Sequence, residues 1–280
     1  MLKNAQMEDI LRAIVLGIVQ GLTEFLPISS SGHLIAVREL FDWGFTDDLT
    51  FDVSLHLGTT AAVLAYFWRD WLTMARAALR WLSGDRERRL DSNYDAHTLA
   101  LLVIGSIPVA IVGLALQDWI EDEIRSPIVV GVMLIAFGGV LFAAESGGRG
   151  DRSVREGGLL DAVIIGGAQA ISLIPGVSRS GITISAGLAR GFSRQDAARF
   201  SFLLSTPAIG GAALLTLSDA ISKGTLADEL DIVVAGATAS AAIGWLSIAY
   251  LMRLVQSRSF LPFVAYRLFA GVFLIAYFAV

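Results

Sequence analysis

The chain carries two altered copies of one short sequence, and this internal repeat constrains its fold more than any other feature. The first copy, GIVQGLTEFLPISSSGH, covers residues 17–33, and the second, GGAQAISLIPGVSRSGI, covers residues 166–182. A constant offset of 149 residues superimposes them without a gap. Each copy is an apolar, helix-like run that stops at a proline and then presents serine and glycine, so each half of the chain is predicted to contain a broken helix.

The two copies differ mainly in charge. Glu24 and His33 occur only in the first copy, and Arg179 occurs only in the second. The two halves therefore offer complementary groups, an acid and an imidazole from one and a guanidinium from the other. We expect these groups to meet at one site.

The composition indicates an integral membrane protein. Of the 280 residues 55% are hydrophobic and only 17% are charged, with a mean hydropathy of +0.65. A soluble domain is nearer to about 45–50% apolar and about 25% charged. The absence of cysteine excludes disulfides and thiolate metal sites. The net charge of −5 gives no indication of nucleic-acid binding, and Glu8 and Asp9 ahead of the first apolar run do not suit a cleavable signal peptide.

Six apolar segments are predicted to cross the bilayer, which takes about 20 residues of helix. They cover residues 51–68, 99–116, 128–144, 202–217, 232–252 and 261–280. Within the fourth segment, Pro207 and the Gly210-Gly211 pair predict a bend.

The two repeated stretches are predicted to be re-entrant hairpins. Residues 10–26 are apolar but short for a span, and Pro27 with the following Ser-Ser-Ser-Gly ends them. Irregular backbone at membrane depth survives only inside protein or beside water. A second short apolar run over residues 34–41 then leads back, and residues 159–174 and 183–188 form the equivalent pair. The alternative is an ordinary span followed by a loop.

The charges of the loops predict the orientation. Four arginine-rich loops are expected in the cytoplasm by the positive-inside rule, at residues 69–95, 149–155, 190–199 and 253–258. Three acidic loops are expected outside, at residues 42–50, 117–125 and 218–230. This alternation works only if neither hairpin crosses the membrane, and it leaves both termini outside.

Three spans separate the two hairpins, so the second hairpin is predicted to enter from the opposite side. The fold class is therefore an all-α integral membrane protein with six transmembrane helices and two re-entrant hairpins in an inverted-topology repeat. The single membrane domain, residues 1–280, is divided into repeats at roughly 8–144 and 157–280. Inverted repeats of this kind place a binding site near the midplane, between the broken helices.

Glu24 is a functional candidate because a carboxylate inside a bilayer costs roughly 2.5–3.5 kcal/mol to insert. It needs a partner, which could be a divalent cation, His33 or Arg179. Arg179 offers a planar fork of donors suited to phosphate oxygens, and it follows Pro175-Gly176 at a helix start that also favours an anion.

Structural roles remain open for several of these residues. Glu24 and Arg179 could form only a buried ion pair, and His33 could cap or pack a helix. Gln20 could orient Glu24 or bond to backbone as readily as touch substrate or metal. His56, in a predicted span, is interpreted as a structural hydrogen-bonding residue.

The motifs GxxQGxTEFLPxSSSGH and PGxSRSGxT resemble the two signature regions of the undecaprenyl-diphosphate phosphatase (BacA/UppP) family, and the resemblance covers the whole chain. It implies an enzyme of the cytoplasmic membrane that removes one phosphate from the polyprenyl diphosphate carrier of cell-wall synthesis, on the outer, periplasmic face. It implies a catalytic set of Glu24, Ser30, His33 and Arg179, with Ser178 and Thr183 near the phosphate. Gln20 stands where many relatives have glutamate, which removes one possible metal-binding carboxylate.

A phosphoryl-transfer site needs charge neutralisation and an in-line nucleophile. Our hypothesis assigns neutralisation to Arg179 and to a Mg²⁺ or Ca²⁺ bound through Glu24. Ser30 or an activated water would attack, and His33 would act as general base or acid. The predicted phosphate-binding residues are Gln20, Ser29, Ser31, Ser178, Ser180 and Thr183.

A secondary transporter or lipid flippase is the alternative, because inverted repeats with broken helices are a transporter design. The pairing of Glu24 and His33 with Arg179 suits bond cleavage more than passage of a solute. The expected partners are a polyprenyl diphosphate lipid and the membrane, with no nucleic acid. Small residues such as Gly138-Gly139 permit contacts within one protomer or between two, so the sequence allows a homodimer.

Overall fold

The computed structural model describes residues 2–44, 48–83, 89–147, 150–223 and 230–279, and every regular element within them is a helix, as predicted. In chain order these elements are α1 (Leu2–Phe25), α2 (Ser30–Phe41), α3 (Asp48–Tyr66), α4 (Trp68–Leu82), α5 (Arg89–Glu123), α6 (Pro127–Ser146), η1 (Val154–Glu156), α7 (Leu159–Ile171), α8 (Arg179–Ala189), α9 (Arg194–Lys223), α10 (Leu230–Leu254) and α11 (Leu261–Phe278).

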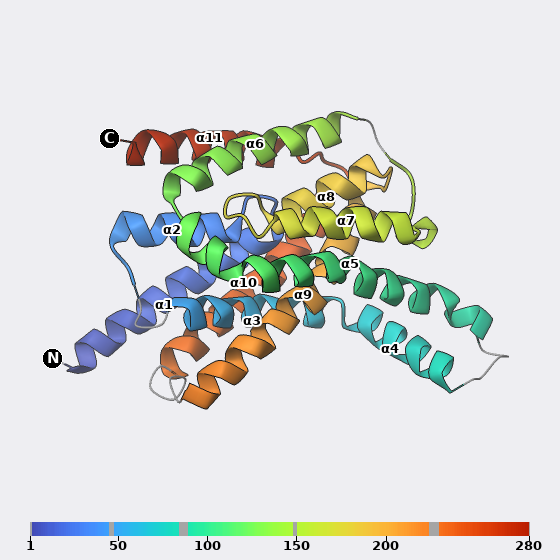
Figure 1. Cartoon of the computed structure of the whole chain (residues 1–280), viewed down its shortest axis with the longest axis horizontal. Helices are drawn as coiled ribbons and strands as arrows, with labels where there is room; N and C mark the ends of the chain where they lie inside the picture. The colour runs from blue at the N-terminus through green and yellow to red at the C-terminus, as the bar shows by residue number, and fades with distance from the viewer. Residues whose placement is uncertain (1, 45–47, 84–88, 148–149, 224–229, 280) are drawn as a thin grey trace.

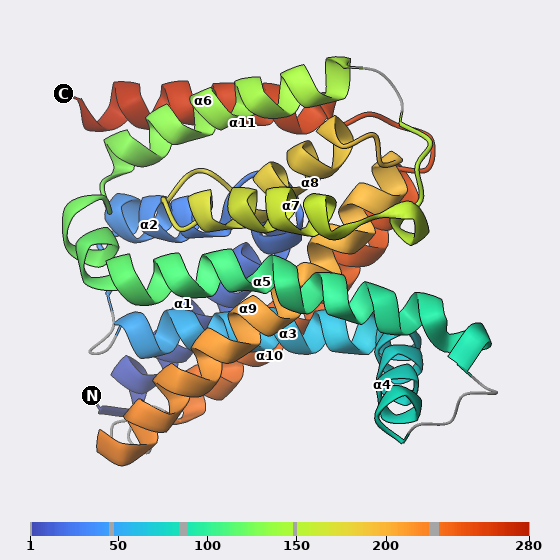
Figure 2. The ribbon, with the colours of Figure 1, turned by 45° about the vertical axis from the view of Figure 1, so that its right-hand side comes forward.

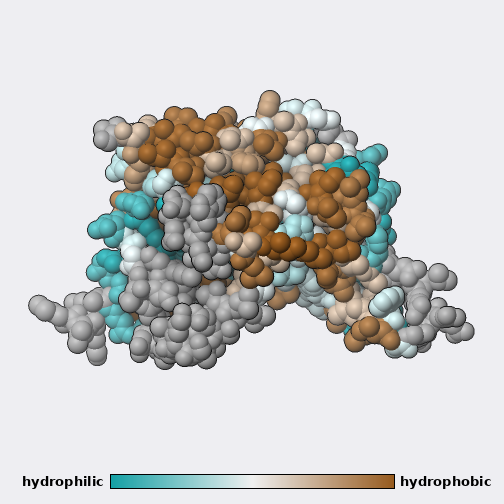
Figure 3. All heavy atoms as spheres, viewed as in Figure 1, coloured by the Kyte–Doolittle hydropathy of each residue, from teal (hydrophilic) through white to brown (hydrophobic). Residues whose placement is uncertain are grey.

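Apolar side chains form a broad band across the face in Figure 3, and hydrophilic side chains gather at the two ends of the molecule. Within the described residues, four helices are long and apolar enough to cross a membrane: Asp95–Leu116 of α5, and the helices α6, α10 and α11. Of the six predicted spans, those that became α3 and α9 are not among these four. The composition and the helices together agree with an integral membrane protein.

Two helix pairs turn back in the middle of the molecule (Figures 1 and 2). The helix α1 runs inward from the end that carries both termini, and α2 returns toward that end. The helices α7 and α8 do the same from the opposite end. The repeat extends to the helix boundaries, because α2 begins at Ser30 and α8 begins at Arg179, which the offset of 149 residues superimposes. We call α1–α2 the first hairpin and α7–α8 the second hairpin.

The two halves of the chain interlock through glycines. The first hairpin packs its helix α1 along α10 of the other half, and the second hairpin packs α7 along α5 of the first half. A Cβ atom on Gly17 would collide with the carbonyl oxygen of Gly236, and one on Gly166 would collide with that of Gly105. Because only glycine lets the backbones approach so closely, equivalent positions of the repeat fix equivalent crossings.

The largest cluster of buried apolar side chains lies where the two hairpins meet the spans behind them. Phe25, next to Glu24 on α1, packs edge-on against Phe202 of α9 with ring centroids 5.3 Å apart. This packing holds the C-terminal end of α1 against α9, and it supports the side of the molecule on which the charged residues of the two copies meet.

The segment of residues 69–95, predicted only as a polar loop, contains the helix α4. Its arginines are spaced so that one face stays apolar: Met74 and Ala77 are buried, and Arg199 of α9 pairs with Asp70. Trp81 is 63% exposed although it is aromatic. A helix with an apolar face and basic residues on the other suits a membrane surface.

Candidate active site

The tips of the two hairpins have the same strained backbone. Ser29 has φ 75° and ψ 99°, and Ser178 has φ 74° and ψ 110°. A positive φ is uncommon for residues other than glycine and costs energy that the surrounding structure must offset. In both cases the serine caps the following helix, with its Oγ accepting a hydrogen bond from the N–H of Gly32 or Gly181. The strain therefore places two helix N-termini, which favour anions, in the middle of the molecule.

Glu24 lies at the centre of a buried polar network and is only 6% exposed. Its Oε1 accepts a hydrogen bond from Nη2 of Arg179 at 2.8 Å, so an ion pair joins the two hairpins. Its Oε2 accepts one from Oγ of Ser30 at 2.5 Å and one from Nε2 of Gln20 at 3.1 Å. Nη1 of Arg179 also donates to the carbonyl oxygen of Ser201 at 3.1 Å. The acid, the hydroxyl and the guanidinium predicted from the sequence are thus in direct contact.

A cavity of about 320 Å³ opens beside this network. Its lining includes Glu24, Ser30, His56, Gln169 and Arg179. Apolar residues of α9 line another part of the wall, where Ala208, Ile209 and Ala212 lie. A polar, charged floor with an apolar side suits a ligand with an anionic head and a hydrocarbon tail.

The hydrogen-bond partners of His33 in the described structure are Ser29 and Tyr266, and Glu24 is not among them. Nδ1 of His33 lies 2.7 Å from the carbonyl oxygen of Ser29, and its Nε2 lies 2.6 Å from the hydroxyl of Tyr266. The two rings stack with centroids 5.6 Å apart. Since a carbonyl oxygen only accepts, Nδ1 carries the proton and Nε2 accepts from Tyr266. The catalytic role predicted for His33 stays a prediction. In this arrangement the lone pair on Nε2, which a general base would use, already accepts the hydrogen bond from Tyr266.

His56 of α3 occupies the place at Glu24 that the sequence hypothesis gave to His33. Its Nε2 lies 3.8 Å from Oε2 of Glu24, and its Nδ1 lies 2.8 Å from the carbonyl oxygen of Asp52. His56 lines the cavity, whereas the sequence analysis interpreted it as structural. The hydrogen bond to Asp52 agrees with the structural role expected of His56, and the position in the cavity wall places its ring beside Glu24 as well.

The remaining predicted phosphate-binding residues fall into two groups. Ser29, Ser31 and Ser178 line the cavity. Ser180 and Thr183 are bonded within the protein: Oγ of Ser180 donates to the carbonyl of Leu26 at 3.0 Å, and Oγ1 of Thr183 donates to that of Arg179 at 2.7 Å. The second group ties α8 to its surroundings, and only the first group lines the cavity.

Arg267 of α11 was not predicted, although an arginine inside the apolar segment 261–280 was a visible indication. It is fully buried and donates to backbone carbonyls at both hairpin tips: Pro27 at 3.2 Å, Gly176 at 3.1 Å and Val177 at 3.0 Å. Its Nε also donates to the carbonyl of Leu134 on α6. One side chain therefore fixes the two loops relative to each other.

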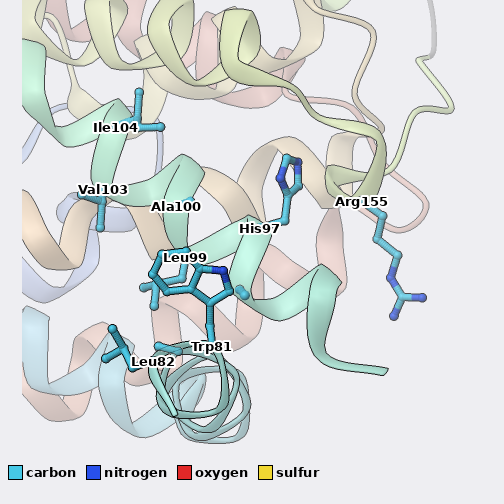
Figure 4. A pocket seen from close by; sticks show the side chains of 10 residues that line it. Trp81, Leu82, His97, Leu99, Ala100, Val103, Ile104 and Arg155 are labelled. Atoms are coloured by element: carbon cyan, nitrogen blue, oxygen red, sulfur yellow. The ribbon is translucent and has the colours of Figure 1, made fainter. Parts of the chain in front are cut away.

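A second, larger hollow of about 1010 Å³ lies between α4 and α5 (Figure 4). Leu82, Leu99, Val103 and Ile104 make most of its wall apolar, with His97 and Arg155 near one end. Nε2 of His97 is occupied by the carbonyl oxygen of Gly157 at 2.8 Å. No carboxylate is among its described lining residues, so the charged site is the smaller cavity.

The fold and the site together define a class: a membrane-embedded protein in which two broken helices bring an acid, a hydroxyl and a guanidinium to one cavity suited to an anion. Comparison with known proteins gives the family. The family model described as "Bacitracin resistance protein BacA" matches residues 13–273, and the chain belongs to this family.

Similar proteins cover almost the whole chain. Proteins named "Undecaprenyl-diphosphatase" from Pelobacter propionicus and Pelotomaculum thermopropionicum are 47% and 45% identical to it, over 94% of this chain and 95% and 94% of theirs. One of the same name from Alcanivorax borkumensis is 43% identical over 97% of this chain and 100% of its own.

Proposed function

We propose that the protein hydrolyses undecaprenyl diphosphate to undecaprenyl phosphate and inorganic phosphate. Family membership and the names of the similar proteins support this activity. The observation that carries it is the pair of hydrogen bonds on one carboxylate: Ser30 donates to one oxygen of Glu24 and Arg179 donates to the other. This arrangement supports assigning the roles of base, nucleophile and phosphate-binding cation to Glu24, Ser30 and Arg179.

In this mechanism Glu24 accepts the proton of Ser30. The Ser30 oxygen attacks the terminal phosphorus, the bond between that phosphorus and the bridging oxygen breaks, and undecaprenyl phosphate leaves with the bonding electrons. Water then hydrolyses the phosphoserine to inorganic phosphate. Direct attack by a water that Glu24 deprotonates is the competing route, and it needs the same base.

Arg179 has two successive roles in this mechanism. Without substrate its guanidinium neutralises Glu24. When the diphosphate enters, its oxygens compete for the guanidinium, whose fork suits phosphate. Loss of the ion pair would free Oε1 of Glu24 at the moment when the substrate is in place. The free N–H groups at the starts of α2 and α8 would stabilise the same negative charge.

A divalent cation fits this donor set. Mg²⁺ and Ca²⁺ prefer oxygen ligands, and Mg²⁺ commonly uses one or two carboxylates and completes its shell with water and substrate phosphates. Glu24, which lines the cavity, supplies one carboxylate, and Gln20 orients that carboxylate through its Nε2. Glu24 would hold the cation, which would add positive charge against the diphosphate.

We further propose that the chain lies in the cytoplasmic membrane with six spans, two re-entrant hairpins and both termini outside. The helix ends near the arginine-rich loops lie at one end of the molecule and both termini lie at the other (Figure 1), which supports this orientation. A homodimer stays a proposal. A Cβ on Gly139 or Gly167 would meet no atom within 4 Å, so both glycines leave open surface for a second protomer.

The test is phosphate release from a polyprenyl diphosphate by detergent-purified protein with added Mg²⁺ or Ca²⁺. Glu24→Ala and Arg179→Ala should each abolish release while the protein keeps its melting profile. Full turnover in both folded variants would overturn the catalytic assignment. A transporter would instead move the substrate unhydrolysed across a liposome membrane, so the released phosphate separates the two functions.

A further inference from the structure

Gln169 of α7 is a buried amide without a partner. Its side chain is 1% exposed, and neither its Nε2 nor its Oε1 makes a hydrogen bond in the described structure. An amide that leaves water without gaining a hydrogen bond costs roughly 1–3 kcal/mol. Such a residue calls for a compensating partner from outside the protein chain.

The repeat explains why Gln169 has no partner inside the protein. Its counterpart in the first hairpin is Gln20, whose Nε2 donates to Glu24 one helical turn further on. The residue one turn after Gln169 is Leu173, which offers no acceptor. The glutamine is retained in the second copy, but the acid that it would bond is missing.

Gln169 also faces the site. It lines the same cavity as Glu24 and Arg179. Gln20 is not among the described residues that line this cavity. Of the two equivalent glutamines, the one without a protein partner is therefore the one that lines the cavity.

We propose that Gln169 is a substrate-binding residue that donates a hydrogen bond from Nε2 to a phosphate oxygen of the diphosphate. This inference rests on the proposed function. The chemistry suits the position, because an amide donor adds a bond to the anion without adding charge beside Glu24. In the ligand-free state the unpaired amide is a cost to folding, which the bound diphosphate offsets.

The experiment measures binding and stability separately. The probe is a short-chain prenyl methylenediphosphonate, whose bridging carbon blocks hydrolysis. Gln169→Leu should bind it about 10- to 100-fold more weakly than wild type, the loss of one hydrogen bond to a charged group. The same variant should melt at the wild-type temperature or above without ligand, because an unpaired amide is replaced by an apolar side chain. Gly167→Ala, on the same helix and facing open space, is the control for binding and should leave the affinity for the probe unchanged.

Gln169→Glu keeps the shape of the side chain, removes both N–H donors and adds a negative charge, so it should weaken binding at least as much. It also provides the test if the leucine variant does not fold. Wild-type affinity in either folded variant overturns the proposal, and a lowered melting temperature with wild-type affinity would assign Gln169 to a buried water only. Failure of the proposed function is a different result, since wild type itself would then release no phosphate.

Discussion

The two hairpins share a backbone and divide the chemistry between them. At their tips Ser29 and Ser178 have φ values of 75° and 74°, and at the ends of their second helices Asp42 and Gly191, also 149 residues apart, have φ values of 53° and 83°. The duplicated sequence has thus kept two positive-φ positions at equivalent places in the two copies, and of the described residues only Gly176, with φ 92°, lacks a positive-φ counterpart in the first copy.

The residues that could react are not duplicated. Glu24, Ser30 and His33 of the first hairpin correspond to Leu173, Arg179 and Ile182 of the second. Two identical copies would bring two acids or two arginines to one cavity, and like charges at short range repel strongly where water is scarce. The comparison indicates that a symmetric backbone can support an asymmetric reaction only if the two halves carry different charged residues at equivalent positions.

The largest effect is expected when position 24 of the first hairpin is given the residue found at the equivalent position of the second hairpin. Glu24→Leu gives the first hairpin the residue that the second has, and it should lower kcat by about 1,000-fold or more, since a general base and a partner of Arg179 are both lost. Adding Leu173→Glu returns an acid to the cavity wall, but on the half that lacks Ser30.

The double variant should therefore remain inactive. Phosphate release from prenyl diphosphate by both purified proteins measures this. Recovery of turnover in the double variant would mean that the position of the acid is unimportant, and the division of roles between the hairpins would have to be abandoned.

The next effect concerns Arg267, the side chain that joins the two hairpin tips. Arg267→Lys keeps the charge but cannot reach the carbonyls of Pro27, Gly176 and Val177 together, because an ammonium has no planar fork. Small displacements of a catalytic group can cost about 100-fold, so kcat should fall by that order. KM should change little, because burial of the polyprenyl chain dominates binding.

Two neighbouring glycines of α6 allow a milder perturbation of Arg267 and a matched control. A Cβ on Gly138 would lie 3.4 Å from the Cβ of Arg267, whereas one on Gly139 would meet nothing within 4 Å. Gly138→Val should push the arginine and lower kcat by about 10-fold, and Gly139→Val should leave it unchanged. Equal kinetics in the two valine variants would argue against a positioning role.

A smaller effect separates the two histidines. His56→Ala should lower kcat/KM by about 10-fold, through loss of one hydrogen-bonding group beside Glu24. His56→Gln should cost less, because glutamine can present a polar group at similar reach. Tyr266→Phe releases Nε2 of His33 without removing the ring, and it should cost less than His56→Ala. A larger loss for Tyr266→Phe would return the leading role to His33.

How far the sequence could predict this site depends on whether a residue lies inside the repeat. The contact of Glu24 with Arg179 follows from charge complementarity between two copies that must meet, so it could be predicted. The role of Ser30, which lies in the same copy as Glu24, came from the family resemblance. The apolar segments were also predicted to be helical, but α1, α5 and α9 extend beyond the predicted ranges 10–26, 99–116 and 202–217, because apolar length marks only the part of a helix that lies in an apolar environment.

The positions of His33, His56 and Arg267 could not be derived in this way. Which face of α2 carries His33, and whether Tyr266 of a distant helix accompanies it, depends on how α11 packs, and no local pattern reports that packing. The helix α4 was missed for another reason: its arginines dominate the composition, and only their spacing shows the apolar face.

The smallest expected effect lies at the bases of the hairpins, where offset 149 pairs Arg12 with Asp161. Arg12 pairs only with Glu8 and Asp9 on its own exposed helix turn. Asp161 accepts from Arg152 at 2.9 Å and from Arg190 at 2.6 Å, and so ties α7 to the end of α8. Asp161→Asn should lower the free energy of unfolding by about 2 kcal/mol, and Arg12→Ala by less than about 0.5 kcal/mol.

Lowering the pH should remove the difference in stability between wild type and Asp161→Asn. Burial would raise the pKa of Asp161, but its hydrogen bonds from Arg152, the N–H of Gly158 and Arg190 outweigh burial and lower the pKa from 3.8 to about 2. A carboxyl whose pKa is lower in the folded state stabilises the protein above its unfolded pKa and loses that contribution as the pH falls through the folded value. The gap between wild type and Asp161→Asn in detergent melting curves should therefore be constant near pH 7 and shrink between about pH 4 and pH 2. A gap that does not depend on pH would show that the second hairpin is held by packing, as the first is, and not by its buried acid.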